Sequence, residues 1–277
     1  MFALFLIAAF ILADVGSLVC AENPPLTAET IMARVAANQD RSNTLRSEYV
    51  YHQHIHAVSR KANGKLMCEE TVDYLMIPTP KGTKKEQKLL TGRYWHKGHY
   101  IQFHVKLSHH DIPIDCALAD SLGSGLTNGS SKDGLDKDLF PLTTSEQTNY
   151  QFWLVGKEIQ EGRTVYDIGF KPREKDEFTW AGEAYIDATD FQPVDVFTKL
   201  SRRIPFVIRT LLVALPGVGF NVQYQRQPGG VWFPASFGTE FRIRVTPFFK
   251  RDITISLENT NFEQTHVQTH IQYVGPK

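Results

Sequence analysis

The chain has 277 residues, and its 30 Lys and Arg residues balance 30 Asp and Glu residues, so the formal net charge at pH 7 is zero. A neutral chain has no overall electrostatic attraction to nucleic acid or to an anionic membrane, and no nucleic-acid partner is expected.

Residues 1–21 are typical of a secretory signal peptide. They form an apolar segment that ends in the small-residue pattern of a cleavage site, with Val19 and Ala21 at its two key positions. The segment lacks a basic residue at its start and carries Asp14 in its apolar part, so an uncleaved anchor is the alternative. Lipid anchoring at Cys20 is less favoured, because no small residue stands directly before that cysteine. We expect an exported chain with a single domain over 22–277.

Two cysteines, Cys68 and Cys116, remain after removal of the leader. In an oxidising compartment an even pair is compatible with one disulfide. Two buried free thiols are the alternative, because spacing along the chain does not give the distance between the cysteines.

The first element expected is a helix from Thr27 to about Asn38. Thr27 is a suitable N-cap, Glu29 lies in the first turn, and Leu26 can pack against Ile31. From Leu45 the apolar period changes to two, which predicts strands near 45–59 and 65–77 joined by a hairpin at Asn63 and Gly64. A further extended segment is expected over 92–107.

The periodic pattern stops between Ser108 and Thr148. This stretch contains "SLGSGLTNGSSKDGLDKDLF", which is rich in residues that favour turns and solvated loops. We expect a long surface loop inserted in the domain, with a short helix near 143–147.

Strands then resume at "YQFWLVGKEI", "TVYDIGFKP", "TWAGEAYIDATD" and "QPVDVFTKLSRR". The last third alternates clearly, which predicts an antiparallel sheet with one apolar and one wet face. The expected apolar set is Phe220, Val222, Tyr224, Phe241, Ile243, Val245, Ile253, Ile255 and Leu257.

The most apolar stretch after the leader is Ile204 to Phe220. It is too short to span a membrane and is interrupted by Arg209 and two prolines. We expect it to form a lid over the apolar sheet face. An exposed patch that docks on a membrane or a lipidated partner is the alternative.

Three histidines alternate in "YVYHQHIHAV", and an extended strand places them on one face. Such spacing can bind zinc, but it also arises on an ordinary solvated strand face. The neighbours disfavour known metal motifs, since Arg60 and Lys61 stand where a cupin-like site needs a carboxylate. No metal site and no cofactor are therefore predicted; the weak candidate ligands are His52, His54 and His56, which His96, His99 and His104 could extend.

No catalytic motif is found. The sequence lacks His-Glu-x-x-His, the Gly-x-Ser-x-Gly elbow and the phosphate-binding glycine loop. Asp187, Asp190 and Asp195 flank a turn, where an Asp usually hydrogen-bonds its own backbone. We expect a protein that is not an enzyme.

The order of elements resembles the LolA-like superfamily of periplasmic lipoprotein-sorting carriers and their relatives, which include the RseB sensor and mycobacterial lipid-binding lipoproteins. The resemblance covers about 27–270. It lies in a first helix before "LRSEYVY", a long meander with "GRYWHKGHYIQF", and a "GEAYID" strand followed by "DFQPVDVFTKL".

The resemblance implies an α+β fold: a curved antiparallel sheet, or incomplete barrel, with helices covering its concave apolar face. It also implies a periplasmic, non-enzymatic carrier that binds lipid or the acyl chains of lipoproteins. A membrane-associated protein partner and a monomeric state are expected with it. The residues expected to line the cavity or lid, chosen by face and apolar character, are Trp95, Phe103, Phe170, Trp180, Tyr185, Phe197, Phe206, Leu211, Leu212, Phe220 and Phe241.

Three alternatives stay open at the sequence level. The apolar face can be packed solid without a cavity. The protein can be an envelope signalling or scaffold module whose 108–148 loop contacts a protein partner. It can also be a metal-dependent enzyme built on the His52, His54 and His56 face.

Overall fold

A computed structural model describes residues 26–79, 82–107, 111–127, 134–135, 140–174, 180–200, 219–244 and 249–265. The helices are α1 (Ala28–Leu45), α2 (Ile114–Leu126) and α3 (Thr144–Gln147), and a 3-10 turn covers Arg46–Glu48. The strands are β1 (Tyr49–Lys61), β2 (Leu66–Thr79), β3 (Gly82–His96), β4 (His99–Phe103), β5 (Tyr150–Gln160), β6 (Arg163–Pro172), β7 (Trp180–Asp187), β8 (Pro193–Leu200), β9 (Gly219–Arg226), β10 (Trp232–Arg244) and β11 (Lys250–Gln264).

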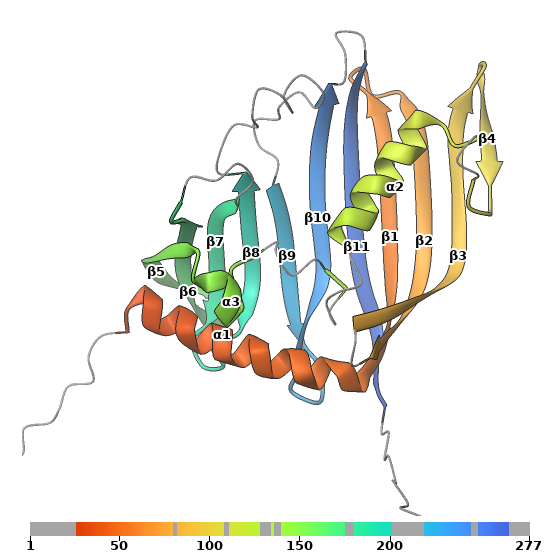
Figure 1. Ribbon diagram of the computed structural model, residues 1–277. Helices are drawn as coiled ribbons and strands as arrows, with labels where there is room; N and C mark the ends of the chain where they lie inside the picture. Colours follow the sequence, from red (N-terminus) through yellow and green to blue (C-terminus); the bar gives the residue numbers. More distant parts are fainter. Residues whose placement is uncertain are drawn as a thin grey trace, which may run out of the picture.

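The described strands form one antiparallel sheet that does not close on itself. Its order is β4-β3-β2-β1-β11-β10-β9-β8-β7-β6-β5, so β4 and β5 are the two edges. Two meanders, β1 to β4 and β5 to β11, are joined by the pairing of β1 with β11. The helices lie on one side of this curved sheet (Figure 1). The predicted α+β fold with a helix-covered open sheet is confirmed.

Helix α1 begins where the sequence predicted and ends later. The Thr27 hydroxyl accepts a hydrogen bond from the Thr30 amide, as an N-cap does. The helix continues past Asn38 because its polar second half has buried partners. Gln39 donates to the side chain of Gln192 at 2.5 Å and accepts from the Arg46 guanidinium at 3.0 Å. Gln192 lies far from Gln39 in the sequence, and Arg46 lies beyond the end of the helix, so the local sequence pattern does not predict these contacts.

The predicted Asn63-Gly64 hairpin is present, with Gly64 at φ 82° and its amide bonded to the Lys61 carbonyl at 2.8 Å. The expected single segment over 92–107 is instead a hairpin. Strand β3 turns at Lys97 and Gly98, both with positive φ, into the short strand β4.

The stretch from 108 to 148 is not a surface loop throughout. It contains helix α2, which the sequence analysis did not anticipate, as well as the expected short helix α3. Leu126, Leu135, Phe140 and Leu142 from this stretch are buried in the main core. The turn-rich composition of this stretch predicted a loop, but part of the stretch packs on the sheet.

The main core fills the concave face between the sheet and the helices. Trp180, Phe220 and Phe237 form a contiguous aromatic row on this face, with ring centroids 4.3 and 5.4 Å apart. The other members of the core include Ile31, Met32, Val35, Ile55, Ile168, Phe170, Ile186, Val196, Val222, Tyr224, Ile243, Ile253, Ile255 and Leu257. The predicted apolar face is confirmed for the described side chains; those of Phe241 and Val245 lie outside the description. No described helix is both long and apolar enough to cross a bilayer.

Gly92 is required where β3 approaches the side chain of β4. A Cβ at Gly92 would lie 2.2 Å from the Phe103 ring and 2.8 Å from the Glu69 carbonyl. We therefore expect Gly92→Ala to lower the free energy of unfolding by about 1–3 kcal/mol through overpacking. Gly238→Ala in β10 is the matched control, because a Cβ there meets no atom within 4 Å. Chemical denaturation checks both variants, and equal stabilities would contradict the packing at Gly92.

Candidate functional site

The candidate site is the concave apolar face under helix α2. In Figure 1, α2 lies across β11, β1 and β2, while α1 runs along one end of the sheet. The residues of α2 that face the sheet are Asp115, Cys116, Ala119, Gly123 and Leu126. Most of these fully buried side chains are small, and the larger Leu118, Leu122 and Leu126 of α2 pack against the main core.

The N-terminal turn of α2 is fixed to three strands by two adjacent residues. Cys116 forms a disulfide with Cys68 of β2. Asp115, which is 5% exposed, accepts hydrogen bonds from Arg251 of β11 through both carboxylate oxygens and from the Ser59 hydroxyl of β1 at 3.0 Å. Both partners of this ion pair are buried, so each depends on the other for compensation of its charge.

The second half of α2 is held by the burial of Leu126 and by the hydrogen bond from Lys85 to the Thr127 carbonyl, and it lacks the disulfide and the buried ion pair of the first turn. Gly123 is buried, yet a Cβ built on it would meet no heavy atom within 4 Å beyond its own helix turn and chain neighbours. Among the described residues, no atom therefore occupies the position that a side chain at Gly123 would take. Gly123 and Gly125 also lower the intrinsic stability of the last turns, since each glycine costs a helix about 1 kcal/mol relative to alanine.

Several titratable side chains lie where α2 packs beside the strands β2 and β3: Glu70, Tyr74, Lys85 and Asp120. Burial raises the pKa of Glu70 to about 7, with a further contribution from the Asp120 carboxylate and an opposing one from Lys106. Burial also raises the pKa of Tyr74, helped by Asp120 and Glu70. Burial lowers the pKa of Lys85 to about 8, and its ammonium donates to the Thr127 carbonyl at the end of α2. The flank of the helix is thus ionisable near neutral pH.

The cavity residues expected from sequence divide between the two faces. Phe103, Phe170, Trp180 and Phe220 lie on the concave face, with Phe103 in a cluster beside the disulfide. Trp95, Tyr185 and Phe197 lie on the opposite, convex face, so their assignment to the cavity is corrected. Their neighbours along the strands, Tyr94, Ala184, Ile186 and Val196, take the concave positions. Phe206, Leu211 and Leu212, and with them most of the expected 204–220 lid, lie outside the described residues.

The histidine row lies on the convex face, where His52 and His54 are exposed. His54 Nδ1 is 2.5 Å from Asp73 Oδ1, and His56 Nε2 is 3.1 Å from Glu69 Oε1. Each of these imidazoles is thus partnered by one carboxylate of β2. Within the described part of the chain, no three His, Cys, Asp or Glu side chains are grouped to hold a metal ion.

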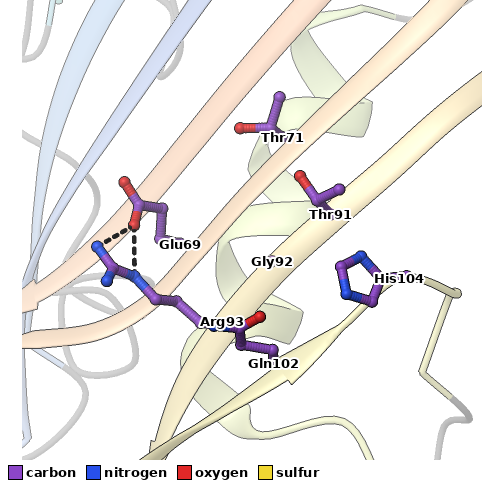
Figure 2. A pocket seen from close by; sticks show the side chains of 7 residues that line it. All are labelled: Glu69, Thr71, Thr91, Gly92, Arg93, Gln102 and His104. Atoms are coloured by element: carbon purple, nitrogen blue, oxygen red, sulfur yellow. Dashed lines mark hydrogen bonds and ion pairs between the residues drawn. The ribbon is translucent and has the colours of Figure 1, made fainter.

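A shallow depression on the convex face of β2, β3 and β4 adjoins the histidine row. It encloses about 200 Å³ and is lined by Glu69, Thr71, Thr91, Gly92, Arg93, Gln102 and His104. Figure 2 shows the Arg93 guanidinium bonded to Glu69, at 2.8 and 2.7 Å, with His104 set apart from the pair. Because these charged groups compensate each other and the depression is open, its arrangement favours a solvated sheet surface.

An open antiparallel sheet with helices in its concave face is the class of fold that these observations define. Solved structures similar to this chain include an outer-membrane lipoprotein-sorting protein domain from Vibrio parahaemolyticus, at 11% identity and TM-score 0.42, covering 89% of this chain and 95% of that one. A DUF1329 family protein from Desulfovibrio piger is similar at 10% identity and TM-score 0.40, covering 88% and 95%. A LolA superfamily protein from Nitrosomonas europaea is similar at 9% identity and TM-score 0.34, covering 87% and 95%.

No protein-family model and no curated protein matches the sequence. Identities and TM-scores of this size say nothing about the roles of individual residues.

The Asp115–Arg251 pair gives a prediction for stability. Asp115→Asn leaves the Arg251 charge buried without its counter-ion, and we expect the free energy of unfolding to fall by about 3–5 kcal/mol. Asp252→Asn is the matched control, because the Arg242–Asp252 pair is exposed on the arginine side and such pairs contribute about 0–1 kcal/mol. Urea denaturation compares the two variants. Equal losses would show that the buried pair does not anchor α2.

The raised pKa of Glu70 gives a prediction for pH dependence. The folded state holds this proton more tightly than the unfolded state, so the stability that the group contributes is complete below pH 4.5 and is lost as the pH rises towards 7. Glu70→Gln should therefore stabilise the protein at pH 8 by about 1–2 kcal/mol, a value discounted for partial exposure, and change little at pH 4. Thermal unfolding at both pH values checks this expectation. An equal effect at the two would contradict it.

Proposed function

We propose that this protein binds lipid, or the acyl chains of lipoproteins, between helix α2 and the concave face of the sheet. The observation that carries the proposal is the space at buried Gly123 of α2, where an added Cβ would meet no heavy atom of the described residues within 4 Å beyond its own helix and chain neighbours. This space adjoins a continuous apolar core, which is a suitable surface for acyl chains. Transfer of each methylene out of water contributes about 0.8 kcal/mol, so a chain of ordinary length can drive binding.

The uneven attachment of α2 supports a hinged opening. The first turn is fixed by the disulfide and by the Asp115–Arg251 pair. The second half contains two glycines, of which Gly123 is buried. Movement of the second half would enlarge the space without breaking the anchor. We infer that α2 is the movable wall of the site and that the 204–220 segment, as the sequence suggests, forms part of the entrance.

The remaining features of the proposal follow from the sequence and from this site. The protein is exported by residues 1–21 to the periplasm, acts as a monomer without a cofactor, and carries its ligand without chemical change. Sorting of outer-membrane lipoproteins is the specific role that the sequence resemblance favours. A scaffold role for the 108–148 stretch has less support, because α2 and Phe140 are used in packing on the sheet.

Two glycines on α2 allow a matched test of the ligand space. Gly123→Leu places a side chain in the buried space, so we expect the affinity for a fluorescent fatty acid to fall by at least about tenfold, the loss of roughly two buried methylenes. Gly125→Leu adds the same side chain at an exposed position and should bind like the unchanged protein. Circular dichroism and urea denaturation confirm that both variants fold.

Three results bear directly on the proposal. Lipid retained at near-unit stoichiometry in native mass spectrometry of the protein purified from its own envelope would support it. A protein that is empty and does not take up fatty acid would overturn it in favour of the scaffold role. Equal binding by the Gly123→Leu and Gly125→Leu variants would place the ligand elsewhere.

A further inference from the structure

We propose that one end of the sheet is a docking surface for an anionic phospholipid membrane. The surface, called the basic rim here, consists of Arg60, Lys61, Lys65, Lys97 and Lys250. Arg60, Lys61 and Lys65 lie close together in the sequence, whereas Lys97 and Lys250 are far from them. They come together because β1, β2, β3, β10 and β11 begin or end at this side of the sheet.

The strand registers place the rim residues at one end. Lys61, the last residue of β1, pairs with Arg251 near the start of β11, and Lys65 lies in the turn that leads into β2. Cys68 near the start of β2 pairs with Tyr94 of β3, which is close to the turn at Lys97. Figure 1 shows these strand ends together on the side of the sheet away from α1.

Within the part of the chain that the structure describes, the five rim cations form no ion pair with a carboxylate. In segments 60–66, 96–99 and 250–252 the one carboxylate is Asp252, and it accepts a hydrogen bond from Arg242 at 2.7 Å. Arg251 in the same segments is buried against Asp115 and adds no free charge. The remaining cations are exposed or half-buried, so they present a positive surface even though the chain as a whole is neutral.

Apolar and aromatic side chains beside the rim favour a membrane over an acidic protein. Ile114, the first residue of α2, is 56% exposed next to the Asp115–Arg251 anchor. Trp95 and Tyr100 lie side by side on β3 and β4 with ring centroids 5.1 Å apart, and the Lys65 ammonium is 3.5 Å from the Trp95 ring centre. Cations combined with Trp and Tyr are typical of the bilayer interface, where basic groups meet phosphates and aromatic rings meet the headgroup level.

The test uses vesicle co-sedimentation with a charge-matched control. The rim variant is Lys61→Gln/Lys97→Gln/Lys250→Gln, and the control is Arg41→Gln/Lys84→Gln/Lys88→Gln, which removes three charges from α1 and the distant half of β3. The probes are vesicles of phosphatidylcholine alone and vesicles with about one third phosphatidylglycerol. Fatty-acid binding is measured on the same samples.

We expect the unchanged protein and the control to bind the anionic vesicles more strongly than the neutral ones. The rim variant should bind them about a hundredfold more weakly, from roughly fivefold for each charge removed. Binding of the unchanged protein should also fall sharply between about 0.05 and 0.5 M salt, as the screening length shortens. Fatty-acid binding by the rim variant should be unchanged, which separates this inference from the proposed function.

Several results would overturn the inference. These are equal binding of the unchanged protein to neutral and anionic vesicles, equal binding by the rim variant and the control, or binding to polyglutamate but not to vesicles. The last result would assign the rim to an acidic protein partner.

Discussion

Helix α2 covers part of the concave face, and its position there depends on the attachment through Asp115 and Cys116. Successive residues of one helical turn are bonded to β11, β1 and β2, so the strand pairing and the position of the helix constrain each other. The ion pair and the disulfide act in different ways. The disulfide limits the unfolded chain, while the buried ion pair makes any other placement of Asp115 costly, because Arg251 would lose its counter-ion.

This attachment explains why a helix of low intrinsic stability can cover the core. Helix α2 contains two glycines and two serines, and of its large apolar residues Leu126 is buried while Leu118 and Leu122 are partly buried against the core. Packing would hold such a helix weakly, but an anchored first turn keeps the remainder close to the sheet. Firm attachment at one end and loose packing at the other are the properties of a hinged wall.

The sequence predicted what depends on local patterns. The alternation of apolar and polar residues predicted the buried faces of β9 and β11, and the Asn63-Gly64 pair predicted the first hairpin. Both signals could be read because they act between neighbouring residues. Helix α2 was missed because its glycines and serines favour a loop, although Leu118, Leu122 and Leu126 pack against the core. Phe197 was assigned to the wrong face: Val194 and Val196 occupy the inner positions of β8, and Phe197 between them points outward. The open space at Gly123 and the basic rim have no sequence signal, since a missing side chain and a set of distant cations become features only in three dimensions.

The central pairing of β1 with β11 has a consequence for how the chain acquires its structure. Strand β1 forms soon after the first helix, but its partner on one side is the last strand, with His54 opposite Glu258. Contacts between such distant segments require the closure of a very long loop, which slows folding. Until β11 is available, β1 remains an open strand edge. A chain arranged in this way stays incompletely folded until nearly all of it has been delivered, which is compatible with the export proposed above.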